Sequence, residues 1–317
     1  MPKALLLSQA EIIGLLDPDQ LLEALAEGFK AITSDPEVVV PPRGELVVPG
    51  TGLLLTMPAR APQLHWCTKL VTDFPGNAQK GLPSHLALIV LLHRETGETL
   101  ALMDGSHITA MRTAGAAVLA AQQLARPDAK VLTILGAGVQ GRAHLELMVP
   151  RFDFEEIHVW SRDRAKAAEL AALDPRARVA DDREAAVRRA DILCLCTHAH
   201  DPLVLAEWVP PGQHISSVGY SPPGGEIDPR IAERHTLCVE ARVAFAPPPA
   251  GCAELAGADP DKASELGELL LGQRPGRRSP EEVTVYKAMG HAIEDLVTAN
   301  LVYRNAIAGS VGRFIDI

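Results

Sequence analysis

The chain lacks the features that mark metal, membrane and nucleic-acid proteins. Its five cysteines form no Cys-x-x-Cys pair and stand at no zinc-like spacing from histidine, so we expect buried free thiols and no metal site. No apolar run approaches the roughly 20 residues of a membrane helix, and the apolar run at the N-terminus is too short for a signal peptide. The net charge of -10 disfavours nucleic acid and anionic membranes as partners. We therefore expect a cytoplasmic protein that binds neither.

The sequence does contain enough apolar material for two hydrophobic cores. Its 317 residues are 47% hydrophobic and 22% charged, which is the balance of an ordinary globular protein. The pattern of apolar residues in the N-terminal part of the chain differs from the strand–helix alternation that follows it. This difference predicts two domains. We expect one domain to comprise residues 1–115 with 295–317, and the other to comprise residues 116–294.

The larger of these predicted domains alternates apolar strands with amphipathic helices. This pattern is typical of an α/β fold with a doubly wound parallel sheet of the Rossmann type. Continuous apolar runs indicate strands that are covered on both faces. The predicted strands are residues 131–135, 157–160, 178–180, 192–197, 214–219 and 236–239.

The other predicted domain is a mixed α+β unit. We expect β-rich runs at residues 52–56, 65–71 and 85–92, after an amphipathic helix over residues 18–32. A long Ala-rich helix over residues 108–124 leads from this unit into the sheet domain. A final helix over residues 281–308 is long enough to return and pack on the first unit.

A glycine-rich turn follows the first strand of the sheet domain and opens a helix. It reads Gly136-Ala137-Gly138-Val139-Gln140-Gly141, and it stands in a strand–turn–helix unit of the length that dinucleotide sites have. The first glycine permits the tight turn, the second lets the diphosphate approach the backbone, and the third lets the helix pack on the strand. The diphosphate would lie at the positive end of the helix. The context predicts a nicotinamide cofactor.

The residues at the end of the second strand indicate whether the cofactor's ribose bears a 2′-phosphate. An NAD site needs an acidic residue there, but this place holds Ser161 and Arg162, with Asp163 following. A guanidinium group binds phosphate with two parallel hydrogen bonds, so the pair suits the 2′-phosphate of NADP(H). We favour NADP(H), and because of Asp163 we keep NAD(H) as the alternative.

Several further motifs, taken with the glycine turn, resemble the ornithine cyclodeaminase/μ-crystallin family. They stand at residues 57–58, 68–71, 103–105, 108–114, 134–140, 207–212 and 292–295, so the resemblance runs nearly end to end. It implies a homodimer formed through the first domain and a small-molecule substrate. It also implies chemistry at a carbon that bears an amino or imino group beside a carboxylate.

Three cations are the candidates for binding the substrate carboxylate. The resemblance places Arg43, Lys69 and Arg112 around that carboxylate. Lys69 stands in an apolar strand, where a lysine is unfavourable unless it has an anionic partner or a function. Arg112 stands in the first turns of a long helix, where a guanidinium group and the helix start together suit a carboxylate. We expect Arg43 and Arg112 to hold the substrate, and Lys69 to orient it or to donate a proton.

One position departs from the deaminating members of the family. Where cyclodeaminases and related alanine dehydrogenases carry an acid/base aspartate, this chain has Ser221. A serine hydroxyl is no general base at neutral pH without an activating neighbour. Residues 53–56 also lack the carboxylate with which cyclodeaminases hold the distal amine. Serine at this position resembles the ketimine reductases, so we count Ser221 with Lys69 and Arg112 as the catalytic candidates.

The expected activity is the reduction of a small cyclic imino acid with a nicotinamide cofactor. Δ1-Pyrroline-2-carboxylate would give L-proline, and Δ1-piperideine-2-carboxylate would give L-pipecolate. Ornithine or lysine cyclodeamination, alanine-type dehydrogenation and non-enzymatic NADPH binding remain the alternatives. Besides the glycine turn, we expect four residues to border the cofactor: Thr197, Val218, Gly219 and Asp295.

Overall fold

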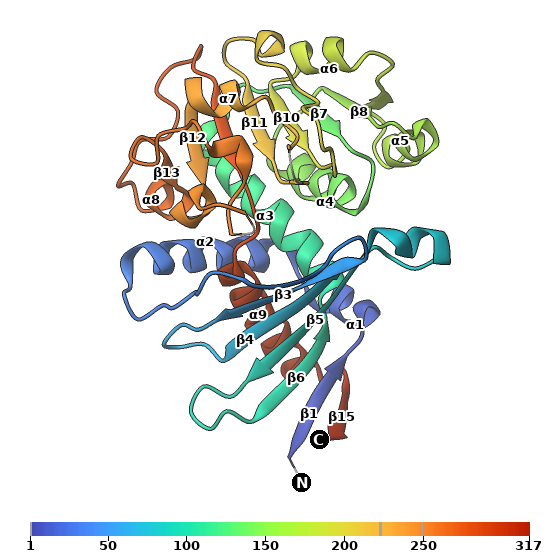
Figure 1. Ribbon diagram of the computed structural model, residues 1–317, viewed down its shortest axis with the longest axis vertical. Helices are drawn as coiled ribbons and strands as arrows, with labels where there is room; N and C mark the ends of the chain where they lie inside the picture. Colours follow the sequence, from blue (N-terminus) through green and yellow to red (C-terminus); the bar gives the residue numbers. More distant parts are fainter. Residues whose placement is uncertain (1, 222–223, 249) are drawn as a thin grey trace. The chain divides into compact units, whose positions relative to one another are not determined.

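The computed structural model describes residues 2–221, 224–248 and 250–317, which form two compact units (Figure 1). The first unit comprises Met1–Arg112 and His291–Ile317, and the second comprises Thr113–Gly290. The α3 helix (Ser106–Leu124) begins in the first unit and continues into the second. The sequence-based boundaries lie at 115 and 295, so the prediction already placed Asp295 with Lys69 and Arg112. In the structure Glu294 belongs to that unit as well.

The first unit is built on a seven-stranded sheet with the order β15-β1-β6-β5-β4-β3-β2. Strands β2 to β6 pair antiparallel with one another in succession, whereas β1 pairs parallel with β6 and antiparallel with β15. The strands are β1 (Lys3–Leu7), β2 (Gly44–Val48), β3 (Gly52–Ala59), β4 (Trp66–Asp73), β5 (His85–Leu92), β6 (Thr99–Asp104) and β15 (Arg313–Asp316). The helices are α1 (Gln9–Leu15), α2 (Pro18–Ser34) and α9 (Ala292–Gly309).

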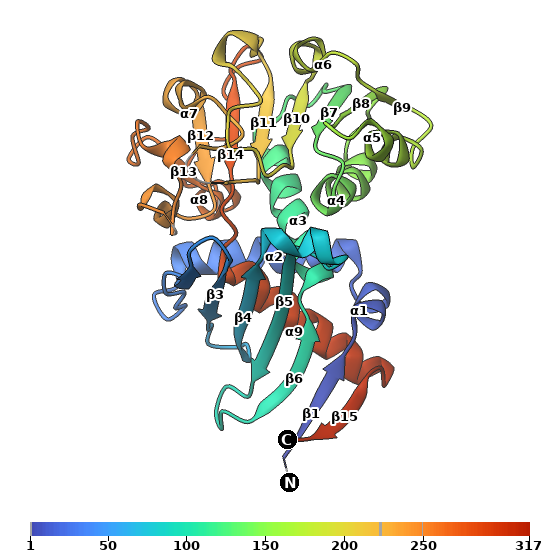
Figure 2. The ribbon, with the colours of Figure 1, turned by 45° about the vertical axis from the view of Figure 1, so that its right-hand side comes forward.

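One face of this sheet is covered by α9, which packs on β3, β4 and β5, and α2 packs on α9 in turn (Figure 2). Gly28 makes the close approach of the two helices possible, because a Cβ atom there would lie 2.9 Å from Cγ1 of Val297. The other face of the sheet is apolar and open. Leu46, Leu86 and Leu88 point to it with exposed fractions of 60%, 45% and 40%.

The second unit is built on a parallel sheet with the order β13-β12-β14-β11-β10-β7-β8-β9 (Figure 2). Its strands are β7 (Val131–Leu135), β8 (Glu156–Trp160), β9 (Ala177–Val179), β10 (Ile192–Leu195), β11 (His214–Ser217), β12 (Thr236–Val239), β13 (Ser264–Glu265) and β14 (Thr284–Lys287). Its helices are α4 (Val139–Met148), α5 (Arg164–Ala171), α6 (Arg183–Arg189), α7 (Pro229–Arg234) and α8 (Leu266–Leu270). The predicted fold class, a Rossmann-type parallel sheet beside a mixed α+β unit, is confirmed.

The strand order places a topological switch between β7 and β10. After β7 the chain proceeds outward through β8 and β9, and it then returns to form β10 on the other side of β7. In such sheets ligands bind beyond the carboxyl ends of the strands at the switch. The turn after β7 and the segments after β10 and β11 are therefore where chemistry is expected.

The prediction of a single final helix over residues 281–308 is wrong. Its first part is β14, a buried strand between β11 and β12, and the helix begins only at Ala292. The run Thr284-Val285-Tyr286 favours a strand, because β-branched and aromatic residues fit a pleated, buried surface. Gly290, with φ of 77°, then turns the chain before the helix starts. Strands β1, β2, β6, β13 and β15 were also not predicted.

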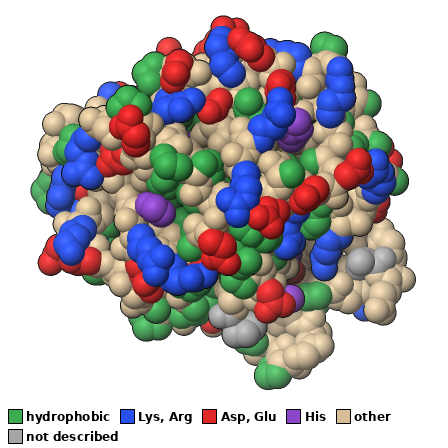
Figure 3. Space-filling view, turned by 90° about the horizontal axis from the view of Figure 1, so that it is seen from above, with side chains coloured by type: hydrophobic (Ala, Val, Ile, Leu, Met, Phe, Trp, Pro, Cys, Tyr) green, Lys and Arg blue, Asp and Glu red, His purple; other side chains and the backbone are tan. Residues whose placement is uncertain are grey.

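All five cysteines are buried free thiols, as expected. Among the described residues, no helix combines the length and the apolar character that crossing a bilayer requires. On the face that Figure 3 shows, basic and acidic side chains are interspersed. That face therefore presents no extended basic surface to a polyanion.

Candidate functional site

The glycine turn after β7 has the geometry of a dinucleotide-binding turn. Gly136 has φ of 112°, a conformation that L side chains rarely adopt, and a Cβ atom there would collide with the carbonyl oxygen of Cys196. A Cβ atom at Gly141 would collide with the carbonyl oxygen of Gly136, so only glycine lets α4 close on the turn. At Gly138 no described atom lies within 4 Å of where a Cβ atom would stand. The turn is thus closely packed at Gly136 and Gly141 and has open space beside Gly138.

The start of α4 leaves backbone donors for a ligand. Gly138 is the N-cap residue and offers no side-chain acceptor to the first N–H groups of the helix. The following residue, Val139, is 71% exposed. Ala137 lies in the turn itself, and Val139, Gln140 and Gly141 form the start of α4. This arrangement fits the diphosphate of a dinucleotide, because uncapped N–H groups and the helix dipole both attract an anion.

Of the two charged residues directly after β8, Asp163 is hydrogen-bonded within the described part of the chain and Arg162 is not. The carboxylate of Asp163 caps α5 by accepting hydrogen bonds from the N–H groups of Ala165 (3.0 Å) and Lys166 (3.2 Å). The hydroxyl of Ser161 accepts from the N–H of Asp163 at 3.2 Å. Arg162 is exposed and makes no hydrogen bond or ion pair with any residue that the structure describes. The acidic group is therefore committed to the helix, whereas the guanidinium group is not.

The buried carboxylate of Glu226 joins the segments that follow β10 and β11. Its Oε1 accepts from the N–H (2.5 Å) and the hydroxyl (2.7 Å) of Thr197. Its Oε2 accepts from the hydroxyl of Ser217 (2.9 Å) and the N–H of Gly219 (2.8 Å). Burial raises the pKa of Glu226, and the charge of Lys287 opposes that shift. Thr197 and Gly219, two of the residues expected at the cofactor, are held together by this one side chain, and Val218 lies between Ser217 and Gly219.

The fully buried Lys287, at the end of β14, completes this arrangement. Its ammonium group donates to the hydroxyl of Ser217 at 3.0 Å and to the carbonyl oxygen of Gly219 at 2.6 Å. It also forms an ion pair of 2.6 Å with Glu254. Burial would lower the pKa of Lys287, but the charges of Glu254 and Glu226 raise it above its usual value. We call Glu226, Glu254 and Lys287, with the groups they bind, the Glu226 network.

The sequence did not point to the Glu226 network. Glu226, Glu254 and Lys287 come from three distant parts of the chain, and Lys287 stood in the segment that was interpreted as a helix. The available signal was a lysine at the end of an apolar run, Thr284-Val285-Tyr286-Lys287, which matches the pattern of the other strands.

Ser221 has a histidine as its hydrogen-bond partner. Its Oγ lies 3.0 Å from Nδ1 of His200, which stands on the segment after β10. His200 is exposed and Ser221 is half-buried. From the sequence no role was assigned to His200, so the neighbour that a serine needs for proton transfer was not predicted.

In the first unit, Lys69 and Arg112 are buried against two carboxylates from the first turn of α9. The ammonium group of Lys69 lies 2.9 Å from Oδ1 and 2.8 Å from Oδ2 of Asp295. Arg112 donates from Nη1 to Glu294 at 2.8 Å, and its Nε lies 3.3 Å from Oδ1 of Asp295. Lys69 thus has the anionic partner that a buried lysine requires. Asp295, expected beside the nicotinamide, is engaged by both cations.

His291 is the N-cap residue of α9 and lies among these charges. Its Nδ1 accepts from the N–H of Ile293 at 3.4 Å, and its own N–H donates to Glu294 at 2.7 Å. Burial lowers the pKa of His291 to about 4; Arg43 and Arg112 also lower it, and Glu294 and Asp295 oppose them. The imidazole is therefore neutral at pH 7. The half-buried Arg43, directly before β2, is thereby placed within electrostatic reach of His291. We call this set the cation cluster: Arg43, Lys69, Arg112, His291, Glu294 and Asp295.

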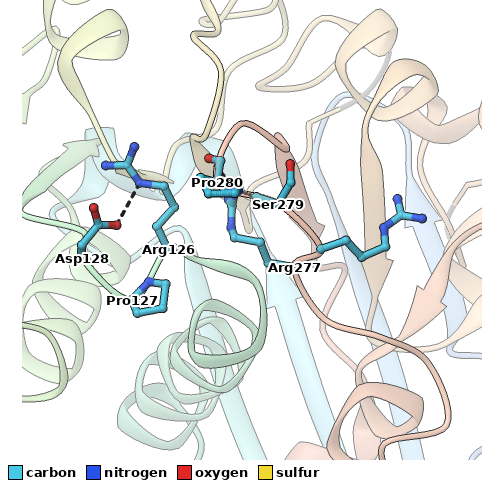
Figure 4. A pocket seen from close by; sticks show the side chains of 7 residues that line it. Arg126, Pro127, Asp128, Arg277, Ser279 and Pro280 are labelled. Carbon is cyan, nitrogen blue, oxygen red and sulfur yellow. Dashed lines mark hydrogen bonds and ion pairs between the residues drawn. The ribbon is translucent and has the colours of Figure 1, made fainter.

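A cavity of about 450 Å³ lies elsewhere in the second unit and is no candidate for the chemistry (Figure 4). Its lining includes Arg126, Asp128 and Arg277, which precede the strands β7 and β14, at the amino end of the parallel sheet. Its guanidinium groups are engaged within the fold. Arg126 pairs with Asp128 at 3.3 Å, and Nε of Arg277 donates to the carbonyl oxygen of Leu124 at 2.8 Å. The guanidinium groups that line this cavity therefore bind other groups of the same unit.

Comparison with known proteins agrees with this geometry. The family model "Ornithine cyclodeaminase/mu-crystallin family" matches residues 3–310. Ketimine reductase mu-crystallin from Mus musculus is 40% identical over 261 residues, which cover 81% of this chain and 82% of that protein. This relative is an oxidoreductase that acts on C=N bonds.

Two solved structures extend the likeness to the whole chain. Δ1-Pyrroline-2-carboxylate reductase from Thermococcus litoralis, in complex with NADH and L-proline, has a TM-score of 0.92 and 31% identity, and the match covers 98% of this chain and 99% of that one. An archaeal alanine dehydrogenase dimer with bound NAD has a TM-score of 0.90 and 31% identity, with 99% of each chain covered. The chain belongs to the ornithine cyclodeaminase/mu-crystallin family.

Proposed function

We propose that the chain reduces a small cyclic imino acid with NADPH. The products would be L-proline from Δ1-pyrroline-2-carboxylate or L-pipecolate from Δ1-piperideine-2-carboxylate. The observation that carries this proposal is the hydroxyl of Ser221, hydrogen-bonded to His200, where deaminating relatives need a carboxylate. Removal of ammonia needs a base that is ionised at neutral pH, whereas reduction of an imine needs only a bound carboxylate, a hydride and a proton.

The cationic side chains of the cation cluster support binding of a carboxylate. Lys69 and Arg112 are buried beside each other with Glu294 and Asp295, and burial keeps His291 neutral. Guanidinium and ammonium groups at one place are what the carboxylate of an imino acid would bind. In this proposal Arg43 and Arg112 hold the substrate carboxylate, and Lys69 orients the ring.

The surroundings of Lys69 differ from those of an ordinary buried ion pair. Burial lowers the pKa of Lys69, Arg112 lowers it further, and Asp295 opposes both. A second cation close to a buried lysine is unfavourable, and Asp295 lies against both of them. A bound carboxylate would add another anion beside the two cations, which supports substrate binding at Lys69 and Arg112.

The cofactor would be held by the turn Gly136–Gln140 and by the segments after β8, β10 and β11. When bound, a nicotinamide dinucleotide supplies the hydride. We propose NADP(H) because Arg162 makes no interaction with the described residues, whereas Asp163 is committed to capping α5. The two solved relatives hold NADH and NAD, so NAD(H) is the alternative that a direct comparison of the two cofactors would test.

We further propose a homodimer that forms through the open face of the first unit's sheet. Leu46, Leu86 and Leu88 expose apolar surface on that face, and such continuous patches mark interfaces. The archaeal alanine dehydrogenase is a dimer. A charge in the patch, Leu86→Glu, should convert the dimer to a monomer in analytical ultracentrifugation. Exposed Leu271→Glu in the second unit should leave the assembly unchanged.

The buried, unpaired thiols favour a reducing compartment, and we propose the cytoplasm. The decisive experiment is an assay of the purified protein with NADPH and each cyclic imine, which should oxidise NADPH and form L-proline or L-pipecolate. Formation of proline and ammonia from L-ornithine with catalytic NAD, and no imine reduction, would establish the cyclodeaminase instead. Oxidation of L-alanine alone would establish the dehydrogenase, and NADPH binding without turnover a non-enzymatic role.

A further inference from the structure

The pair formed by Ser221 and His200 has a feature that simple loop packing does not require. The imidazole nitrogen lies 3.0 Å from the serine hydroxyl, and His200 is exposed whereas Ser221 is half-buried. His200 can therefore exchange protons with water, and Ser221 is the less exposed of the two residues. An imidazole is the side chain that most readily takes up and releases protons near neutral pH.

The fold holds the two partners together from both sides. Thr197, three residues before His200, and Gly219, two residues before Ser221, bind the same carboxylate of Glu226. A Cβ atom at Gly219 would collide with the carbonyl oxygen of Thr197, and one at Gly224 with that of His200. The segments that follow β10 and β11 are thus in backbone contact on each side of the pair. Their spacing is set by buried groups and does not depend on the hydrogen bond itself.

We propose that Ser221 and His200 form the proton relay of the imine reduction, an inference that rests on the proposed function. Reduction of C=N adds an electron pair with hydrogen, as hydride, to carbon and a proton to nitrogen. The Ser221 hydroxyl gives its proton to the nitrogen as the C=N bond becomes CH–NH. The serine oxygen takes a proton from the imidazolium form of His200. His200 is then protonated again from water, and the charges balance.

Lys69 is the competing donor, and its surroundings argue against repeated proton delivery. It is 1% exposed and is held by both carboxylate oxygens of Asp295. An ammonium group that gave up its proton there would leave Asp295 less well paired and would have no direct contact with water. Lys69 is therefore better suited to orienting the substrate, and the exposed His200 to renewing the proton.

The test compares wild type with His200→Asn, because Asn can keep a hydrogen bond to Ser221 but cannot carry a proton. We expect kcat for imine reduction to fall about 10- to 100-fold, with KM for the imine within about twofold. We also expect the pH profile of kcat to lose its fall at alkaline pH. Ser221→Ala should cause a similar loss, and the double variant should add little to it. Other ionisable groups on or against these segments include His198, Asp201, Tyr220, Glu226, Glu254 and Lys287, and they are unchanged in the variant.

The matched control is His198→Asn, an exposed histidine on the same segment, which should keep wild-type kcat and pH profile. NADPH affinity, measured by fluorescence, verifies that His200→Asn remains folded. Wild-type kcat and an unchanged pH profile in His200→Asn would overturn the relay while leaving the proposed function intact. If wild-type protein reduces no cyclic imine, the proposed function itself fails, and the relay with it.

Discussion

The two units each bury one lysine completely, and the two lysines have opposite surroundings. Lys69 in the first unit is paired with Asp295 but lies close to Arg112, and its pKa is lowered by burial and by that second cation. Lys287 in the second unit lies between Glu254 and Glu226, whose charges raise its pKa. The same residue type, equally buried, shares its carboxylates with a second cation in one unit and lies between two carboxylates in the other. We propose that this difference reflects two roles, ligand binding for Lys69 and stabilisation of the fold for Lys287.

The substitution Lys287→Met should have the largest effect of those that test this difference, and the effect should be on stability. Without its ammonium group, Glu254 and Glu226 would be buried beside no cation, and the carbonyl oxygen of Gly219 would lose its donor. We expect the free energy of unfolding to fall by about 3–5 kcal/mol, measured by urea denaturation. The exposed Lys166→Met in the same unit is the control and should change stability little. A loss below about 1 kcal/mol would show that Lys287 does not hold the fold.

Lys69→Met should have its main effect on activity. Arg112 would still pair with Asp295, so the remaining carboxylate keeps a cation and the fold is affected less. We expect kcat/KM for the imine to fall about 100-fold, because the substrate loses a cation that orients it. Lys3→Met, at an exposed position of the same unit, should keep wild-type kcat/KM. If Lys69→Met destabilised the protein as strongly as Lys287→Met but kept its kcat/KM, the two lysines would have the same role.

The sequence could predict Lys69 but not Lys287, and the reason is physical. A charged residue inside an apolar strand is visible in the sequence, and the strand around Lys69 was recognised. The partners of Lys287 come from the segments after β11 and β12, which only the folded sheet brings together. The strand that carries it was also mistaken for the start of a helix.

The glycine turn is the opposite case, because its requirements are local. Tight backbone at Gly136 and Gly141 and open space at Gly138 follow from the order of strand, turn and helix, which the sequence contains. The pairing of Ser221 with His200, by contrast, depends on the neighbouring positions of β10 and β11 in the sheet. Local motifs were predictable, whereas contacts across the sheet were not.

Acid should destabilise both units through buried histidines. Burial lowers the pKa of His144 and of His291 to about 4, and that of His214 to about 3, from the ordinary 6.5. Because these folded-state values lie below 6.5, the unfolded chain takes up protons first as the pH falls. The stabilisation is complete above about pH 6.5; it is lost progressively between 6.5 and about 4 for His144 and His291, and down to about 3 for His214.

His291→Asn measures how much His291, in the first unit, contributes to this acid sensitivity. Asparagine is also a good N-cap residue, so the cap of α9 is kept. We expect wild type to lose stability between pH 7.5 and pH 5.0 in urea denaturation, and the variant to lose about 1–2 kcal/mol less. The exposed His198→Asn should follow wild type. An equal loss of stability in His291→Asn and wild type would mean that the acid sensitivity lies in the second unit alone, with His144 and His214.

The smallest expected effect concerns the cofactor and extends the comparison to arginines after β8. Arg162 makes no interaction with the described residues, whereas the exposed Arg164 pairs with Asp181. A cation that the fold leaves available can bind the 2′-phosphate, and removing it should weaken NADPH binding more than NADH binding. We expect Arg162→Ala to lower the preference for NADPH, as the ratio of kcat/KM values, about tenfold, or about 1.4 kcal/mol. Arg164→Ala should leave the ratio unchanged. A wild-type protein that prefers NADH, with a ratio insensitive to Arg162, would favour NAD(H), and Arg162 would then be a surface charge of the second unit.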